Sequence, residues 1–320
     1  TMLNRIKDRW TSSRLFPCLV AAAMLALVAS SPSWAQDTGR KVAILVGINK
    51  YDGRLRDLDY AERDVTELGK VLKEQGFEVR VLIATGTGDD KATLANVEKA
   101  VKATLAKIGK KDLLLIGLAG HGFQLEVPDA QGKLESGAFF CPVDARKGDP
   151  ATMLSISKLI EQIDDSGASA NLLLVDACRE DPSRGRGLDG STVKLLPEGV
   201  AALLGCRANQ QTFESDKAGG GHGIFFHFVI EGLKGAAANP TTGEVSWLGL
   251  VEYVTKQVPA SAQAWAEKKQ TPNHVANLQD VPVLARVKLP DHRLPDPRPS
   301  LIVPAPAGTP VTPPPDEKGK

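Results

Sequence analysis

The sequence has little of what would mark a specialised class of protein. Only 5% of its 320 residues are aromatic, only four are cysteine, and the formal net charge at pH 7 is +1. It has no internal repeat, and its composition excludes a coiled coil, a collagen and a wholly disordered chain. With 42% hydrophobic and 24% charged residues, it is a globular chain long enough for one large α/β domain or two small ones.

Excess charge of one sign is also missing from the body of the chain. Residues 1–35 hold four basic residues and one acidic residue: Arg5, Lys7, Arg9, Arg14 and Asp8. Setting these aside leaves 35 basic and 37 acidic side chains, a net charge of −2. A domain this close to neutrality has no electrostatic basis for binding nucleic acid, so we expect no nucleic-acid partner.

The first 35 residues have the order of features that is typical of a secretory signal peptide. A basic start precedes an apolar stretch from Leu15 to Ala29, and small residues then lead to Ala35. We expect cleavage after Ala35 and export to the periplasm or the extracellular space. The alternative is a membrane anchor, but the apolar stretch from Leu15 to Ala29 is shorter than the run of about 20 residues that a spanning helix needs. No later segment is apolar enough to span a bilayer, so we expect no stable membrane insertion after cleavage.

Cysteine is scarce, and its number is odd after that cleavage. Cys141, Cys178 and Cys206 remain. An odd count in an exported protein leaves at least one thiol outside any intramolecular disulfide, or it implies a bridge to another chain. The sequence has no Cys-x-x-Cys pair, so a redox role is the weakest of the functions that we consider.

Proline is concentrated at the C-terminus, where ten of the 32 residues from Leu289 onward are proline. Such a segment forms neither a helix nor a central strand, and it is typical of an extended, solvated tail. We therefore divide the chain into a signal peptide over residues 1–35, a folded domain over 36–288 and a Pro-rich disordered tail over 289–320.

The folded domain alternates between two hydrophobic patterns. Continuous apolar runs predict buried strands at 42–46, 77–83, 113–119, 172–175 and 200–204. Stripes with spacings of three and four predict helices over 58–72, 94–108 and 154–163. This alternation predicts an α/β fold with a mainly parallel sheet and helices on both faces. Residues 123–142 are rich in Gly, Pro and Asp, and we expect a β-hairpin excursion there.

Two chemically useful residues follow two of the predicted strands. His121 lies between two glycines directly after the strand at 113–119, and Cys178 follows the strand at 172–175. Ligands and chemistry gather beyond the carboxyl ends of strands in open α/β sheets. A thiol beside an imidazole is the basic requirement of nucleophilic cysteine catalysis. We therefore expect a catalytic pair here, with glycines that let the backbone turn sharply around His121.

Three other residues compete for these roles. His222 lies in a second Gly-His-Gly segment, but a helical segment follows it at once, so we interpret it as a helix-entry residue. Cys206 also ends a strand, but Arg207-Ala208-Asn209 follows it without the paired acidic residue. Cys141 follows two phenylalanines, and we expect it to pack in the core as a small hydrophobic residue.

The segments at 113–122 and 173–179 resemble the two catalytic blocks of caspase-like cysteine peptidases. The Asp-Ala-Cys triplet that starts at Asp176 is similar to the bacterial metacaspase and paracaspase (orthocaspase) branch. The resemblance starts at 41–51 and continues through 219–232 and 270–272. It implies a caspase-like three-layer sandwich and cysteine endopeptidase activity on protein or peptide substrates. It implies no cofactor; calcium activation is common in metacaspases, but the sequence has no Asp-rich loop of binding type.

The resemblance also implies a role for each catalytic residue. Cys178 would attack the scissile carbonyl, and His121 would act as general base and then as general acid. The backbone N–H groups of Gly122 and Cys178 would stabilise the oxyanion, where loss of one donor typically costs about 3 kcal/mol. Arg179 would either favour the thiolate or point to solvent.

Three acidic residues match the pattern that selects Arg or Lys in the metacaspase and paracaspase branch. They are Asp64, Asp176 and Glu214. The alternatives are that Asp176 caps its own turn and that Asp64 and Glu214 are solvated. Arg184 and Arg186 lie in the Gly-rich segment 179–199, which makes self-cleavage there a hypothesis. A different class also stays open, namely a non-proteolytic caspase-like interaction or signalling module, although such modules usually lack the Cys-His dyad.

Overall fold

A computed structural model describes residues 39–289, apart from residues 54, 129–131, 180–195 and 208–209. Of Cys178 and Arg179 it describes the backbone alone. The expected signal peptide and its cleavage site lie outside the described residues, as do all but the first residue of the Pro-rich tail and most of the segment expected to be self-cleaved. The following description concerns the body of the chain from Arg40 onward.

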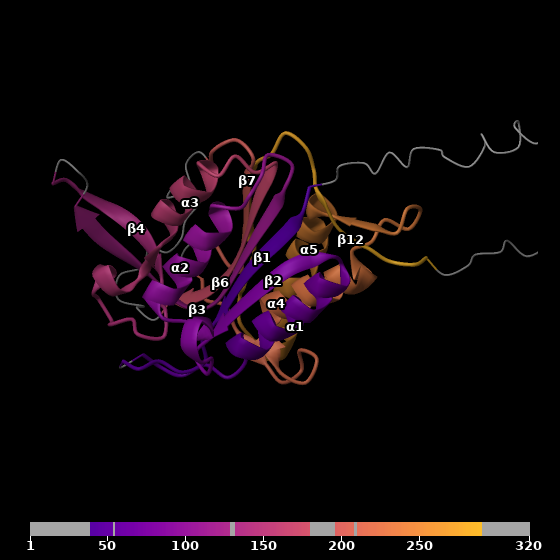
Figure 1. The fold of residues 1–320 in the computed structure, drawn as a ribbon. Coiled ribbons are helices and arrows are strands. Elements are labelled where there is room, and N and C mark those ends of the chain that lie inside the picture. Colours follow the sequence, from indigo (N-terminus) through magenta and orange to yellow (C-terminus); the bar gives the residue numbers. More distant parts are fainter. Residues whose placement is uncertain (1–38, 54, 129–131, 180–195, 208–209, 290–320) are drawn as a thin grey trace, which may run out of the picture. The chain divides into compact units, whose positions relative to one another are not determined.

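A central sheet forms the middle layer (Figure 1). Five neighbouring strands are parallel, in the order β7 (Val200–Leu204), β6 (Ala170–Arg179), β3 (Leu113–Pro128), β1 (Lys41–Gly47) and β2 (Phe77–Ile83). β11 (Asn273–Asn277) adds to β7 as an antiparallel edge strand. β4 (Leu134–Phe140) and β5 (Leu154–Ser155) extend the sheet from β3 in antiparallel pairs. The five apolar runs of the sequence are therefore the five parallel strands.

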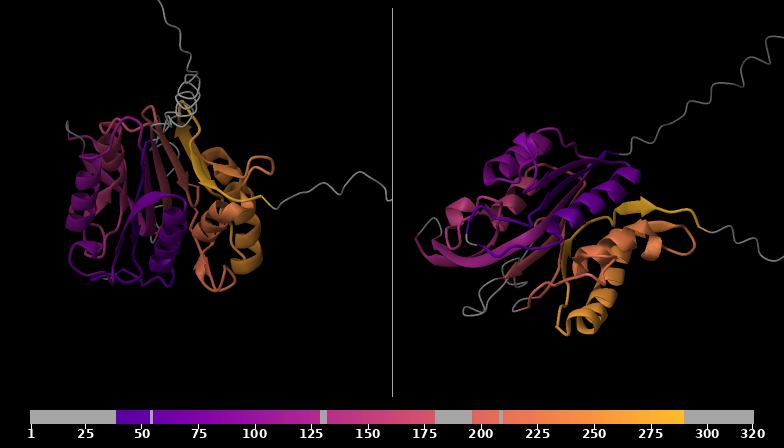
Figure 2. Two further views of the ribbon diagram at one scale, coloured as in Figure 1. Left: turned by 45° about the vertical axis from the view of Figure 1, so that its right-hand side comes forward. Right: turned by 90° about the horizontal axis from the view of Figure 1, so that it is seen from below.

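Helices cover both faces of this sheet, as the views in Figures 1 and 2 show. α2 (Leu94–Leu105) and α3 (Ile156–Asp164) pack on one face, and α1 (Ala61–Glu74), α4 (Ile224–Glu231) and α5 (Trp247–Ala266) pack on the other. The side chains of β1 alternate between the two cores, because successive residues of a strand point to opposite faces. The predicted α/β three-layer architecture is confirmed.

Local sequence explains where the helices begin. Thr93 and Ser155 precede α2 and α3, and their side-chain oxygens accept the backbone N–H groups of Asn96 and Lys158. Such caps satisfy donors that have no partner in the first helical turn. The third predicted stripe included Leu154, which instead pairs with β4 as part of β5, so α3 begins two residues later.

β3 and β6 extend beyond the ends of the parallel strands that flank them. β3 loses β1 as a partner after Ala119 and continues for nine residues to Pro128, paired with β4. β6 loses β7 after Val175 and continues to Arg179. The hairpin expected over 123–142 is present, but its first strand is a continuation of β3. The sequence pattern suggested that the chain turns out of the sheet at Gly120, but the chain continues through this residue in β3.

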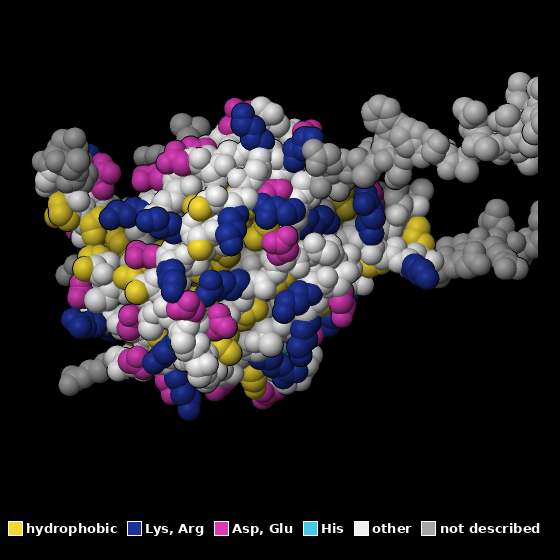
Figure 3. All heavy atoms as spheres, viewed as in Figure 1, with side chains coloured by type: hydrophobic (Ala, Val, Ile, Leu, Met, Phe, Trp, Pro, Cys, Tyr) yellow, Lys and Arg dark blue, Asp and Glu magenta, His cyan; other side chains and the backbone are white. Residues whose placement is uncertain are grey.

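Smaller elements complete the described chain. β8 (Glu214–Ser215) pairs with β9 (His222–Gly223), and β10 (Glu244–Ser246) pairs with β12 (Val283–Arg286). Short helical turns are η1 (Gly88–Asp90), η2 (Pro150–Thr152) and η4 (Gly232–Ala236). Basic and acidic side chains are interspersed on the face drawn in Figure 3. Within the described part of the chain, no helix is both long enough and apolar enough to cross a membrane.

Candidate active site

The extension of β3 and β6 brings the two expected catalytic residues into register. Ala119 lies opposite Asp176, and His121 lies opposite Cys178 in the parallel pairing. Neighbouring strands run about 4.8 Å apart, so the backbones of His121 and Cys178 are immediate neighbours. Both residues lie past the ends of β1 and β7, where the flanking strands no longer cover them. His121 and Cys178 are 57 positions apart in sequence, but they are direct partners in the sheet.

His121 is fully buried, and its surroundings fix its ring. Its backbone N–H donates to the Tyr51 hydroxyl at 2.7 Å, and the two rings stack with centroids 5.1 Å apart. Its Nε2 lies 2.7 Å from the carbonyl oxygen of Arg56. A carbonyl only accepts, so Nε2 carries a proton, and in the neutral imidazole Nδ1 is the basic nitrogen. Tyr51 and the Arg56 carbonyl were not predicted, because a backbone acceptor leaves no signal in sequence.

The glycines beside His121 serve close packing rather than a turn. A Cβ at Gly120 would lie 2.8 Å from the Tyr51 hydroxyl, and a Cβ at Gly122 would lie 2.9 Å from the Cβ of Ala177. The expectation of a sharp turn here is wrong, since the segment is a continuous strand. Gly122 lies opposite Arg179 in β6 and opposite Phe140 in β4, one residue beyond the His121–Cys178 rung.

The three expected substrate-binding carboxylates converge on one small pocket. Asp64 comes from α1, Asp176 from β6 and Glu214 from β8, and all three line a pocket of about 20 Å³ that opens to solvent. Thr212, Gly120 and Gly223 are also part of its wall. Gly120 directly precedes His121, and Asp176 comes two residues before Cys178, so two residues of the pocket wall are close in sequence to the expected catalytic pair.

Asp64 is buried with 1% of its surface exposed, but it is well supplied with donors. Oδ1 accepts from Nδ1 of His222 at 2.6 Å, and Oδ2 accepts from the backbone N–H of Gly223 at 3.0 Å. Burial raises the pKa of Asp64 to about 6, although the bonds from His222 and Gly223 act in the opposite direction. Its carboxyl group therefore changes charge close to neutral pH.

Asp176 is also buried, with 7% of its surface exposed. Burial, and then the negative charge of Asp64, raise its pKa well above the usual range, while a hydrogen bond with Thr212 lowers it. Among the described residues its buried Oδ1 has no hydrogen-bond partner. A Cβ on Gly223 would lie 2.8 Å from Oδ2 of both Asp64 and Asp176. The missing side chain at Gly223 thus leaves the space between the two carboxyl groups open.

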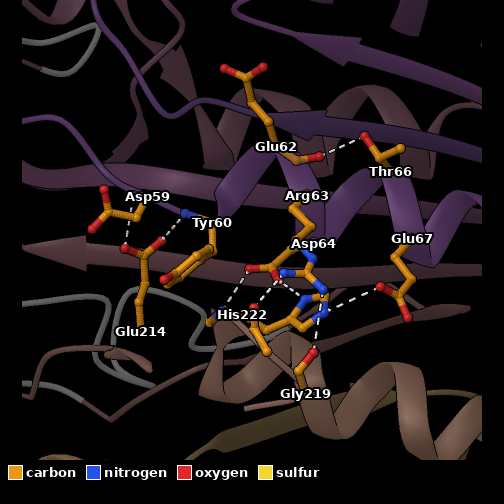
Figure 4. Close-up of polar contacts among 12 residues, drawn as sticks. Asp59, Tyr60, Glu62, Arg63, Asp64, Thr66, Glu67, Glu214, Gly219 and His222 are labelled. Carbon is orange, nitrogen blue, oxygen red and sulfur yellow. Dashed lines mark hydrogen bonds and ion pairs between the residues drawn. The ribbon is translucent and has the colours of Figure 1, made fainter. Parts of the chain in front are cut away.

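Glu214 lines the pocket, but its carboxylate also has structural bonds. Its two oxygens accept the backbone N–H groups of Asp59 and Tyr60 at 3.0 and 2.9 Å, just before α1 begins (Figure 4). Its charge contributes to the raised pKa values of Asp64 and Asp176. The alternative that Asp64 and Asp176 are solvated or merely cap turns does not describe these buried, converging groups.

The competing residues lie elsewhere or have other contacts. His222 directly precedes Gly223, the N-cap of α4, which agrees with a helix-entry position. Its buried contact with Asp64 was not predicted, because the two residues are 158 positions apart. Cys206 is buried and its Sγ donates to the carbonyl of Gln210 at 3.2 Å, and Cys141 is buried in the core beneath the hairpin.

Among the described residues, no cluster of three or more His, Cys, Asp or Glu side chains could hold a metal ion.

Comparison with known proteins agrees with this architecture. The model of the caspase domain family matches residues 40–281. The fold is similar to a Geobacter sulfurreducens protein at 20% identity and a TM-score of 0.55, covering 78% of this chain and 97% of that one. It is also similar to caspase-1 from Spodoptera frugiperda at 19% identity and a TM-score of 0.54, covering 78% and 91%. The structure of pro-sf-caspase-1 gives 18% identity, a TM-score of 0.54 and coverage of 78% and 92%. No curated protein matches the chain.

A mainly parallel sheet between two helical layers, with a histidine and a cysteine on one rung, defines the class as a caspase-like α/β protein. The chain belongs to the caspase domain family, since that model matches most of its length. Members of this family are generally cysteine peptidases, and such a domain implies protein substrates.

Proposed function

We propose that this protein is a cysteine endopeptidase with a Cys178–His121 dyad that cleaves after Arg or Lys. The observation that carries the proposal is the parallel register of β3 and β6, in which His121 and Cys178 are backbone neighbours. A non-proteolytic interaction module would have no use for that pairing together with a buried acidic pocket beside it.

The proposed reaction follows from the hydrogen bonds of His121. Its Nε2 donates to the Arg56 carbonyl, so Nδ1 is the nitrogen that takes the proton from the Cys178 thiol. The thiolate attacks the scissile carbonyl carbon, and the backbone N–H groups of Gly122 and Cys178 stabilise the oxyanion. The imidazolium then protonates the leaving amine as the C–N bond breaks, and water hydrolyses the resulting thioester with His121 as base.

The proposed specificity follows from the carboxyl groups of the pocket. A guanidinium group can make paired, charge-assisted hydrogen bonds with carboxylates, and it would supply the partner that Asp176 Oδ1 lacks among the described residues. An acidic or uncharged substrate side chain would leave buried carboxyl groups without a cation. This acidic pocket and the Asp176-Ala177-Cys178 triplet support an assignment to the metacaspase and paracaspase branch.

The test is hydrolysis of reporter peptides that end in Arg, Lys or Asp before the leaving group. We expect the wild-type protein to cleave the Arg and Lys peptides and Cys178→Ala to cleave none. Cys206→Ser is the matched control, because a hydroxyl can still donate to the Gln210 carbonyl. Preference for the Asp peptide, or activity that survives in Cys178→Ala and disappears in Cys206→Ser, would overturn the assignment. Running the assay with and without calcium shows whether calcium activates the enzyme.

Self-cleavage after Arg184 or Arg186 is a further part of the proposal, although both residues lie outside the described part of the chain. Its support is the match between these basic residues and the acidic pocket. Intact-mass spectrometry of the purified wild-type protein should give fragments that end at one of these residues. The same measurement on Cys178→Ala should give one uncut chain, and identical fragments from both proteins would show that another protease made the cut.

We also propose that the protein is exported, on the order of basic, apolar and small residues in 1–35. N-terminal sequencing of the protein from its native host should begin at Gln36. Recovery of residues 1–35 on protein from the cytoplasm would contradict export.

A further inference from the structure

His222 lies between two carboxylates on α1 (Figure 4). Its Nδ1 is 2.6 Å from Oδ1 of Asp64, and its Nε2 is 3.3 Å from Oε2 of Glu67. Carboxylate oxygens accept hydrogen bonds, so Nδ1 carries the proton in the short contact with Asp64, and Nε2 faces the negative charge of a second carboxylate. The ring is 3% exposed, and a buried cation is stable only where opposite charge surrounds it.

The remaining charged groups around His222 are of both signs. On α1, Arg63 contributes a positive charge near Glu67; on η4, Lys234 donates to the other oxygen of Glu67 at 2.9 Å. On α4, the His227 ring lies 6.1 Å away, and burial, the largest effect, lowers its pKa. The groups that face this cluster from all packed elements are Asp64, Glu67, Arg63, Asp176, Glu214, His227, Glu231 and Lys234.

The loop that delivers His222 is tied to the same helix. Arg63 donates to the carbonyls of Gly220 and Gly219 at 2.6 and 3.3 Å. Gly221 has φ of +114°, and a Cβ there would lie 2.4 Å from the ring of Tyr60. The chain therefore turns against α1 in a conformation that glycine adopts readily, and it sets His222 directly over Asp64.

We propose that His222 is a positioning residue for the specificity pocket: as an imidazolium between Asp64 and Glu67, it keeps the Asp64 carboxylate ionised and oriented toward the space that receives a basic substrate side chain. This inference rests on the proposed function, since it explains how that pocket keeps its charge. Asp64 lies beside Asp176. Without His222, the Asp64 carboxylate would lose its nearest cation but would keep Asp176 as a neighbour. Protonation of Asp64 would then compete with binding of the substrate cation.

The first test does not depend on activity. Nuclear magnetic resonance of the ¹⁵N-labelled Cys178→Ala protein at pH 7 should give two protonated ring nitrogens for His222, assigned by their absence in His222→Asn. A neutral His222 ring at that pH would overturn the inference whether or not the protein is a peptidase.

The second test is kinetic and uses an Arg reporter peptide between pH 5.5 and 9. At pH 6.5 His222→Leu should raise KM at least about tenfold and leave kcat within about twofold, since the reacting atoms are untouched. The acid limb of kcat/KM should move to higher pH, because Asp64 must then ionise without a cation. The rise in KM should shrink as pH increases. A merely structural role would lower activity equally at every pH.

Two further variants keep this test decisive if His222→Leu does not fold. His222→Asn has an amide that can replace Nδ1 as donor but carries no charge, so KM should recover in part while the acid limb stays displaced. Glu67→Gln removes the outer carboxylate, which is 30% exposed, and should give a smaller rise in KM. His274→Asn on β11, outside the cluster, is the matched control and should leave the pH profile unchanged. An unchanged profile in all three variants of the cluster, with active wild type, overturns the inference; an inactive wild type would instead contradict the proposed peptidase.

Discussion

The chain contains the same tripeptide twice, and the two copies differ in almost everything except sequence and burial. Gly120-His121-Gly122 lies inside β3, where His121 donates through Nε2 to a backbone carbonyl. Gly221-His222-Gly223 leads into α4, where both ring nitrogens of His222 face carboxylates. One ring is surrounded so that it can be a neutral base, and the other so that it can be a cation.

The difference teaches that partners, rather than the local sequence, decide what a buried histidine does. Both histidines directly adjoin a glycine in the wall of the same pocket, namely Gly120 and Gly223. The glycines beside the two histidines also differ in purpose. Gly122 lets β6 approach, whereas Gly223 keeps the space between Asp64 and Asp176 open.

The largest expected effect separates the two histidines by what they change. His121→Ala and Cys178→Ala should each reduce kcat for an Arg peptide by at least about 10³-fold at every pH, because each removes a group that takes part in bond breaking. Variants of His222 should change mainly KM and its pH dependence. The double variant His121→Ala/Cys178→Ala should be no worse than either single one, since the two residues act as a unit. If His121→Ala changed mainly KM and left kcat nearly unchanged, the two histidines would not differ in this way.

The next effect concerns the carboxyl groups themselves. Asp176→Asn should lower kcat/KM for the Arg peptide by about 100-fold, because the bound cation would lose a carboxyl group that can give up its proton and pair with it. Its kcat/KM for an uncharged isostere should change much less. Asp165→Asn, at the C-cap of α3, is an exposed control and should behave as wild type. If Arg and uncharged peptides lose activity equally, Asp176 supports the fold rather than selecting the substrate.

A smaller effect is expected from filling the space between the carboxyl groups. The methyl group of Gly223→Ala would lie 2.8 Å from each of them, so KM for the Arg peptide should rise about tenfold or more. The backbone at this position has φ of −58°, which alanine adopts freely, so folding should be retained. Gly109→Ala is the matched control, since its added Cβ meets its nearest neighbour only at 3.7 Å. Equal KM values for the two variants would show that a substrate does not use this space.

The smallest effect is on stability, and its sign follows from the raised pKa of Asp176. The native carboxyl group holds a proton that the unfolded chain releases near pH 4, so stability falls as pH rises from about 4 through the raised pKa. Asp176→Asn does not titrate and should escape this loss. Thermal unfolding should give the variant the higher Tm at pH 8, by a few degrees for about 1 kcal/mol, and the difference should shrink toward pH 4. A difference in Tm that does not vary with pH would contradict the raised pKa.

These regions also show which features of the fold can be predicted from the sequence alone. Apolar runs predicted all five parallel strands, because a strand covered on both faces must be apolar throughout. The same strand predictions placed His121 and Cys178 at one edge of the sheet. The continuation of β3 through Gly120 was missed, because glycine in a strand resembles a turn until its close neighbours are known.

The pocket was predictable in composition but not in its hydrogen bonds. Asp64, Asp176 and Glu214 were recognised as candidates, and the structure brings them together. The bonds from Gly223 and His222 to Asp64, and from the backbone N–H groups of Asp59 and Tyr60 to Glu214, join segments about 150 residues apart. Periodicity describes single elements, so it carries no signal for such contacts.

The central claim is that a peptidase site recognises positive charge through these carboxyl groups. The most direct measurement is kcat/KM of the wild-type protein for two reporter peptides that differ only in Arg or citrulline at the cleavage position, since citrulline keeps the shape and loses the charge. We expect Arg to be preferred by at least about 100-fold at pH 7.5, which corresponds to about 2.7 kcal/mol of discrimination. Equal values for the two peptides would contradict the account.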